Sequence, residues 1–235
     1  MIRFYAPDIK LTGQLPESDS QHAVRVLRMR EGDELQIVDG KGSVMTCRIV
    51  DAHSKHTSVE ILDTKEEILP WSQQLTVAVA PTKHMDRMEW MVEKMTEIGV
   101  NRIIPMLCER SERKEIKVER LEKIAVSAMK QSLKATLPII DGMTRLREIL
   151  EKATGINKYA GYCDESLPRI DFTESYVPRS DTLILIGPEG DFSPTEIKMA
   201  IDMGVTPVTF GKNRLRTETA ALYGLTACHI LDDSQ

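Results

Sequence analysis

The chain has 235 residues, of which 31 are basic, 36 are acidic and 41% are hydrophobic. This composition excludes a disordered or collagen-like chain, and the length suffices for one large domain or two smaller ones. The longest apolar runs fall far short of the ~20 residues of a membrane span, and the first residues lack a signal-peptide pattern. We therefore expect a cytoplasmic protein without membrane association.

Residues 1–69 have the pattern of a small β domain. Glu34–Val38 and Ser43–Val50 are strand-compatible runs on either side of Asp39-Gly40-Lys41-Gly42, which is a strong hairpin signal. A further strand is expected over residues 59–62. Short strands at this spacing indicate a barrel.

One short helix is expected to interrupt this barrel. Ser20 is its candidate N-cap and Gly32 its end. The boundary of the domain falls at Ile68-Leu69-Pro70, because proline disfavours helix before it and cannot donate to a strand ladder.

After Pro70 the pattern changes to strands that alternate with helices. This alternation predicts a mostly parallel sheet with helices on both faces. The expected strands are Leu75–Ala80, Arg102–Leu107, Tyr159–Cys163, Leu183–Ile186 and Val205–Phe210. The expected helices are Met88–Ile98, Val118 to near Pro138, Leu146–Leu150, Pro194–Met203 with a capping box at Ser193, and Thr217–Leu231.

Several common catalytic and binding motifs are absent. The sequence has no phosphate loop, no dinucleotide fingerprint and no nucleophile elbow. Its histidines are scattered, and the cysteines at 47, 108, 163 and 228 have no metal-ligand or disulfide-framework spacing. We expect no metal site, and four free thiols that pack in the interior.

Two glycine-bearing loops directly follow strands of the expected parallel sheet. They are Ile186–Phe192 and Phe210–Ala220. Ligands of open α/β sheets bind at the carboxyl ends of strands, and glycine lets the backbone approach a ligand closely. Each loop also has a purely structural interpretation, as a turn leading to the Ser193 cap and as a helix cap at Thr217 with Glu218 near the positive helix end. Together they favour a nucleotide-like ligand held by backbone groups.

The same loops carry a resemblance to a known family. Ile186-Gly187-Pro188-Glu189-Gly190 and Phe210-Gly211-x-x-x-Leu215-Arg216-Thr217-Glu218-Thr219-Ala220 closely resemble the SPOUT methyltransferases and, within them, the RsmE family. The likeness extends over His22-x-x-Arg25-Val26-Leu27-Arg28, Gly32-Asp33, Asp39-Gly40, Met88-Glu89, Lys94, Glu97–Val100, Glu109-Arg110-Ser111 and Gln131-Ser132. Two positions depart from the family pattern: Lys130 replaces a usual Glu, and Asp191 a common Gly.

The resemblance implies a fold, a reaction and partners. The fold is a PUA-like RNA-binding β-barrel over residues 1–69, followed by a SPOUT α/β domain over 70–235 with a trefoil knot near residues 183–225. The reaction is methylation of uridine N3 in 16S ribosomal RNA of the small ribosomal subunit, at the uridine that the family's name numbers 1498. The methyl donor is S-adenosylmethionine, no metal is needed, and the protein is a homodimer.

The resemblance also assigns site residues. Uracil N3 must lose a proton before it attacks a methyl group, so an arginine at the forming negative charge would assist. Arg216 is the first candidate and Arg110 and Arg25 are weaker ones, while Glu218 acts as base or orienter unless it only caps its helix. Arg25, Arg28 and Arg30 would bind RNA phosphates. The donor would contact Ile186, Gly187, Glu189, Gly190, Phe210, Gly211, Leu215, Thr217 and Ala220, with Gly190 at positive φ or against the donor.

Two other functions stay open at this point. One is a different SPOUT enzyme, which methylates a ribose 2′-oxygen or a tRNA base. The other is an RNA-binding ribosome assembly factor without catalysis. The basic clusters can also be solvated helix faces, because five glutamates are interleaved with the cluster that begins at Arg110.

Overall fold

The computed structural model describes residues 2–164 and 168–234, which fall into two compact units. One unit comprises Met1–Pro70 and Val126–Leu137, and the other comprises Trp71–Ala125 and Pro138–Gln235. The segment 126–137 joins the first unit because Met129 and Ala135 pack with Val38 in a small buried cluster. The expected division at residues 69 and 70 did not include this second segment.

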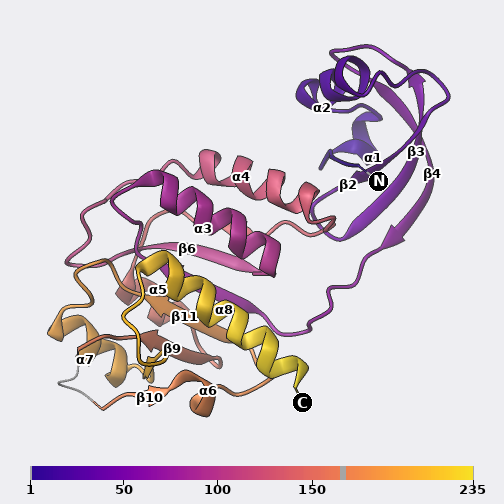
Figure 1. Cartoon of the computed structure of the whole chain (residues 1–235). Coiled ribbons are helices and arrows are strands. Elements are labelled where there is room, and N and C mark those ends of the chain that lie inside the picture. Colours follow the sequence, from indigo (N-terminus) through magenta and orange to yellow (C-terminus); the bar gives the residue numbers. More distant parts are fainter. Residues whose placement is uncertain (1, 165–167, 235) are drawn as a thin grey trace. The chain divides into compact units, whose positions relative to one another are not determined.

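The first unit is built on a four-stranded sheet in the order β1-β2-β3-β4 (Figure 1). Its strands are β1 (Arg3–Tyr5), β2 (Glu34–Val38), β3 (Ser43–Asp51) and β4 (Ser58–Glu66). β1 pairs with β2 in parallel, and the remaining pairs are antiparallel. β1 is only three residues long and was not predicted from the sequence. Alternate residues of β2 and β3, including Ile37, Met45 and Cys47, point into a core that also contains Phe4 and Ile9.

The hairpin predicted between β2 and β3 is confirmed. Asp39 Oδ1 accepts hydrogen bonds from the backbone N–H groups of Lys41 (2.8 Å) and Ser43 (3.1 Å). Gly40 and Gly42 adopt φ values of 78° and 113°, which favour glycine.

The expected helix between Ser20 and Gly32 is wrong in both its start and its end. The chain instead forms α1 (Ile9–Thr12), α2 (Glu17–Gln21) and a π-helical turn, η1 (His22–Val26). Ser20 lies inside α2 and is buried, and its hydroxyl accepts from Thr57 N and donates to Leu15 O. The hydroxyl thus joins two buried backbone groups instead of capping a helix.

Lys130, the first departure from the family pattern, has a structural partner in the first unit. It lies on α4 (Val118–Gln131), 2.7 Å from Asp19 Oδ1 and 5.8 Å from the centre of the Phe4 ring. The other oxygen of Asp19 accepts from Tyr5 N at 3.0 Å. The lysine therefore pairs with a nearly buried carboxylate that also holds β1.

The second unit is built on a parallel sheet in the order β10-β12-β9-β11-β5-β6-β7, with β8 paired to β6. Its strands are β5 (Leu75–Val79), β6 (Arg102–Leu107), β7 (Ile139–Ile140), β8 (Thr144–Arg145), β9 (Asn157–Gly161), β10 (Ile170–Asp171), β11 (Thr182–Ile186) and β12 (Thr206–Thr209). The central strand β11 is buried along its whole length, between β9 and β5. The five strands expected from the sequence are confirmed, and the two-residue strands were missed.

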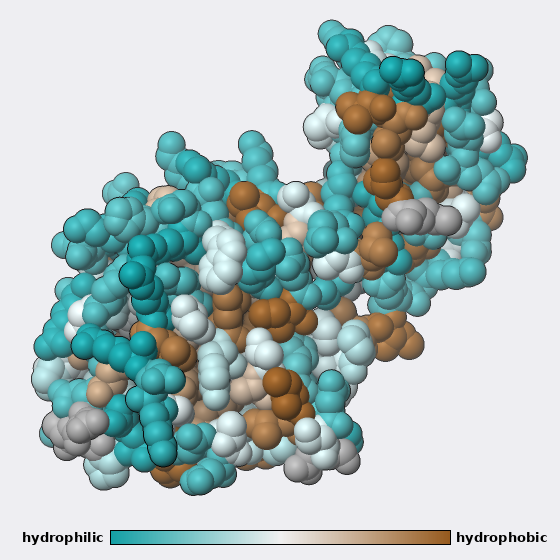
Figure 2. Space-filling model, in the orientation of Figure 1, coloured by the Kyte–Doolittle hydropathy of each residue, from teal (hydrophilic) through white to brown (hydrophobic). Residues whose placement is uncertain are grey.

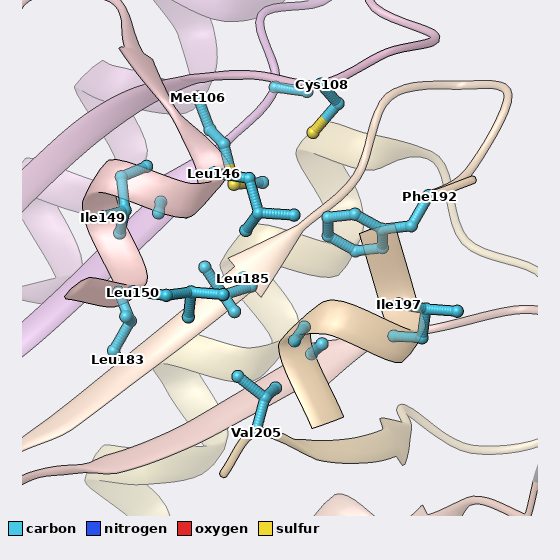
Figure 3. Close-up of a cluster of buried hydrophobic side chains, with 14 of the residues drawn as sticks. Met106, Cys108, Leu146, Ile149, Leu150, Leu183, Leu185, Phe192, Ile197 and Val205 are labelled. Carbon is cyan, nitrogen blue, oxygen red and sulfur yellow. The ribbon is translucent and has the colours of Figure 1, made fainter. Parts of the chain in front are cut away.

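Helices cover both faces of this sheet. α5 (Leu146–Lys152) and α7 (Pro194–Asp202) pack with Leu183 and Leu185 on one face (Figure 3). α3 (Met85–Ile98) and α8 (Thr217–Asp233) pack on the other, where Gly224 of α8 lies close to Ile184. A short helix, α6 (Phe172–Ser175), contacts α8 and β12. In the described part of the chain, no helix is both long and apolar enough to cross a membrane.

Candidate active site

A cavity of about 1310 Å³ lies in the second unit, at the carboxyl edge of the parallel sheet. It is lined by residues that follow β5, β6, β9, β11 and β12, so five strands of one sheet supply its walls. This is the edge at which open α/β sheets bind ligands. Both loops singled out from the sequence reach it.

The loop after β11 forms one wall. It turns sharply, with Asp191 N donating to Pro188 O at 2.8 Å. Gly187 is buried, and a Cβ added to it would lie 3.1–3.2 Å from Phe192. The backbone at Gly187 therefore approaches Phe192 more closely than a side chain would allow.

Of the two alternatives expected for Gly190, positive φ is wrong. The left-handed residue of this loop is its neighbour, Asp191, at φ 63°. The Asp191 carboxylate accepts from Phe192 N (2.8 Å) and from the distant Cys163 N (2.9 Å), so one local and one long-range hydrogen bond support this conformation. Gly190 is not among the residues that line the cavity, and its Cβ position would meet Arg110 at an ordinary 3.6 Å.

The loop after β12 forms the opposite wall. Gly211 has φ 86°, and Thr209 Oγ1 donates to its carbonyl oxygen at 2.8 Å. A Cβ at Gly211 would meet no described atom within 4 Å, so the backbone there borders open space. Thr217 begins α8 but does not cap it: its hydroxyl donates to Gly187 O at 3.3 Å and so links the two loops.

Most of the predicted donor contacts are brought together in this cavity. Apart from Gly190, the lining includes Ile186, Gly187, Glu189, Phe210, Gly211, Leu215, Thr217 and Ala220. Apolar side chains stand beside exposed backbone groups, a combination that suits the adenine and ribose of a nucleotide-like donor.

The three candidate catalytic residues also line the cavity. Arg216 is exposed, and its guanidinium makes no hydrogen bond or ion pair with any described residue. Glu218 is nearly buried, and its Oε1 lies 3.9 Å from Arg87 Nη1. Arg110, in contrast, donates to the carbonyl oxygens of Gly190 (2.8 Å) and Phe192 (3.3 Å).

Several lining residues were missed in the sequence analysis. They include Lys83, His84 and Arg87 after β5, Glu112 after β6, and also Arg169 and Asp171. The residues after β5 could have been predicted, because they directly follow a predicted strand of the same sheet. No group of three or more potential metal ligands occurs among residues 2–164 and 168–234.

Cysteines follow the prediction with one exception. All four are free thiols; three of them are buried, but Cys163 is exposed at the cavity. Partial burial and then the Asp191 carboxylate raise the pKa of the Cys163 thiol above its ordinary value. A thiol of raised pKa stays protonated at neutral pH and is a poor nucleophile.

The first unit carries the predicted RNA-binding arginines. Arg25, Arg28 and Arg30 are all exposed, in and just after the π-helical turn η1. Arg28 has φ 57°, which is a strained value for a residue with a side chain. Arg28 and Arg30 line a hollow of about 500 Å³ together with Val24, Met29, Glu31 and Ala52.

The fold and the cavity define an α/β protein that binds a nucleotide-like ligand and carries an added β unit. Two family models match the chain: "RNA methyltransferase domain" over residues 69–229 and "RNA methyltransferase PUA domain" over residues 15–62. The chain therefore belongs to the RNA methyltransferase family with an N-terminal PUA domain.

Known relatives align with this chain over almost its full length. "Ribosomal RNA small subunit methyltransferase E" of Rickettsia conorii is 28% identical over 93% of this chain and 89% of its own. A crystal structure of a probable rRNA-methyltransferase from Porphyromonas gingivalis has a TM-score of 0.95 at 43% identity, over 100% of this chain and 99% of its own. The Neisseria gonorrhoeae ribosomal RNA small subunit methyltransferase E, solved with bound S-adenosylmethionine, has a TM-score of 0.85 at 28% identity, over 98% of both chains. These relatives confirm the resemblance to the RsmE family.

Proposed function

We propose that this protein methylates N3 of a specific uridine in 16S ribosomal RNA, at the position that the family's name numbers 1498, with S-adenosylmethionine as donor. The observation that carries the proposal is a cavity lined by the two glycine-bearing loops, with Arg216 on its wall and no side-chain partner for Arg216 among the described residues. Membership of the RNA methyltransferase family supports the reaction class.

The residues around the cavity fit the donor. The backbone at Gly211 borders open space, Gly187 lets the chain pack closely against Phe192, and Phe210 and Leu215 offer apolar contact. Bound there, the donor supplies an electrophilic methyl group. No metal enters this transfer.

The chain's own residues must stabilise the negative charge that forms on the uracil. The N3 proton leaves, the N3 electron pair forms the new bond to the methyl carbon, and the carbon–sulfur bond of the donor breaks with its pair on sulfur. Arg216 would stabilise negative charge on a uracil oxygen, because a guanidinium remains charged at any physiological pH. Glu218 would accept the proton or orient the base, with Arg87 beside it.

We assign RNA binding to the first unit. Arg25, Arg28 and Arg30 are exposed on one short segment, as phosphate-binding residues need to be. The target base must be unpaired or turned out of its stack to present N3. Such a substrate in the small ribosomal subunit also agrees with a cytoplasmic location.

We further propose a homodimer with the second loop and α8 at its interface. Tyr223 and Ile230 of α8 are 43% and 59% exposed, and Figure 2 shows hydrophobic residues gathered over this helix. Exposed apolar groups of this kind are typical of interaction surfaces. Sedimentation should give a dimer at micromolar concentration, and a fully active monomer would contradict the proposal. The trefoil knot remains a prediction.

Two experiments separate this function from its alternatives. Calorimetry with S-adenosylmethionine should give saturable binding, whereas a non-catalytic assembly factor would show none. Nucleoside mass spectrometry of 16S ribosomal RNA from a deletion strain should then show loss of N3-methyluridine, restored by the wild-type gene. Loss of a ribose 2′-O-methyl group or of a tRNA modification instead would favour a different methyltransferase of the same superfamily.

A further inference from the structure

The segment Glu109–Arg113, which follows β6, is hydrogen-bonded to the loops that follow β5 and β11. We propose that it is a positioning element: Arg110 and Arg113 hold the cavity walls in place through backbone carbonyls, and Arg110 does not act on the uracil. This inference deepens the proposed function, on which its relevance to methyl transfer rests.

The segment is first fixed to its own strand. Ser111 is buried, its Oγ accepts from Cys108 N at 3.0 Å, and its N donates to Cys108 O at 3.1 Å. The two bonds close a tight turn. A buried turn with satisfied backbone groups is a rigid base for the side chains that leave it.

Glu196 then ties this turn to α7. Glu196 is 7% exposed, and both oxygens of its carboxylate accept from backbone N–H groups: Oε1 from Glu109 (2.8 Å) and Oε2 from Ser193 (2.9 Å). The second bond belongs to the capping box of α7. The helix that follows the β11 loop is thus fastened to the β6 segment by a charge-assisted hydrogen bond.

Arg110 reaches the β11 loop itself. Its Nη1 donates to Gly190 O at 2.8 Å and to Phe192 O at 3.3 Å, on both sides of the strained residue Asp191. Two carbonyl oxygens of the donor loop thus hold Nη1 of Arg110 and set the position of its guanidinium. Arg216 has no such partner among the described residues, which separates the roles of the two arginines.

Arg113 contacts a second loop, the one after β5. Its Nη2 donates to Lys83 O at 2.8 Å and its Nε to Thr82 O at 3.3 Å. The same loop is linked to the β11 loop, because Lys83 N donates to Glu189 Oε1 at 3.1 Å. Lys83 and Glu189 both line the cavity, so the three loops form one hydrogen-bonded frame around it.

The test compares R110A and R113A with R147A, which removes one exposed arginine from α5 and serves as a charge-matched control. Hydrogen–deuterium exchange without donor should rise in residues 187–192 for R110A and in residues 81–84 for R113A, and stay unchanged in R147A. Calorimetry should show donor Kd raised about tenfold or more in both test variants, the size expected for a lost hydrogen bond from a charged group. At saturating donor, kcat should remain within about threefold of wild type.

Variants with lysine at the two arginine positions provide a second test of the inference. Arg110 uses a single nitrogen, so R110K should recover most of the donor affinity, whereas R113K should not, because Arg113 uses two nitrogens in a fork that lysine lacks. Normal donor binding in R110A with a hundredfold loss of kcat would overturn the inference and return Arg110 to the uracil. Unchanged exchange in both alanine variants would also overturn it. Failure of the wild type to bind donor would instead count against the proposed function, because the exchange measurement does not depend on donor.

Discussion

Arg216 is the residue on which the proposed chemistry depends most. Replacing it with alanine should leave the donor Kd within about threefold of wild type but lower kcat by about 10²–10³-fold, the usual loss when one stabilising group for transition-state charge is removed. The fold should be unaffected, because Arg216 precedes α8 without a side-chain capping bond. Calorimetry and a methyl-transfer assay on the same sample test this, and wild-type turnover would refute the assignment.

Replacing glycine with alanine should have different effects at Gly187 and at Gly190 of the β11 loop. A Cβ at Gly187 must displace Phe192, whereas a Cβ at Gly190 makes ordinary contact with Arg110. Overpacking of this kind costs about 1–3 kcal/mol. Gly187→Ala should therefore weaken donor binding about tenfold, and Gly190→Ala by no more than about threefold. Calorimetry measures both donor affinities. A larger loss of affinity in Gly190→Ala than in Gly187→Ala would mean that Gly190, and not Gly187, shapes the wall that contacts the donor.

The β2–β3 hairpin depends on one carboxylate. Burial alone would raise the pKa of Asp39, but hydrogen bonds from Lys41 and Ser43 overcome it and leave the pKa below its ordinary value. A lowered pKa stabilises the folded state above the unfolded pKa of ~3.9, and this stabilisation is lost as pH falls through the folded pKa.

Asp39→Asn should thus reduce the free energy of unfolding by about 1 kcal/mol at pH 7, with a smaller difference from wild type at pH 3. Urea denaturation at the two pH values measures it. Asp63→Asn is the control, since Asp63 is exposed and its pair with Lys65 at 3.7 Å should contribute little. A difference that does not change with pH would show that the Asp39 charge is not what matters.

Elements with strong local signals were predictable from the sequence. The Asp39–Gly42 turn, the capping box at Ser193 and the buried strand Thr182–Ile186 all have short-range patterns that local physics enforces. The failures depend on distant partners. Ser20 has a cap-forming side chain, but Thr57 and Leu15 lie within its reach only in the folded unit.

The same distinction holds for the candidate site. The two glycine-bearing loops were visible because glycine and strand ends mark ligand contacts. The roles of Arg110 and Arg113 were not visible in the sequence. Their partners are backbone carbonyls about 80 and 30 residues away in the chain, and such partners carry no sequence signature. Positive φ at Asp191 was likewise hidden, since it rests on a contact with Cys163.

At the scale of the whole molecule, the two units have different tasks in the proposed function. If the first unit binds RNA phosphates, its arginines should control the salt dependence of RNA binding and leave donor binding alone. Each phosphate contact releases condensed counterions, so its loss should reduce the slope of log K against log salt by about 0.7–1.

Arg25→Ala and Arg28→Ala should each flatten that slope and leave the donor Kd unchanged. Arg28→Ala should have the larger effect on affinity, because the strained φ of Arg28 fixes where its side chain leaves the chain, while Arg25 has a local partner in Ser54 Oγ at 3.3 Å. Arg48→Ala is the matched control, since Arg48 is exposed on β3 but pairs with Glu34 at 3.2 Å. Filter binding of a 16S ribosomal RNA fragment over a salt series gives the slopes. Slopes equal to wild type in both variants would remove the RNA-binding role from this segment and leave its basic residues as a solvated surface.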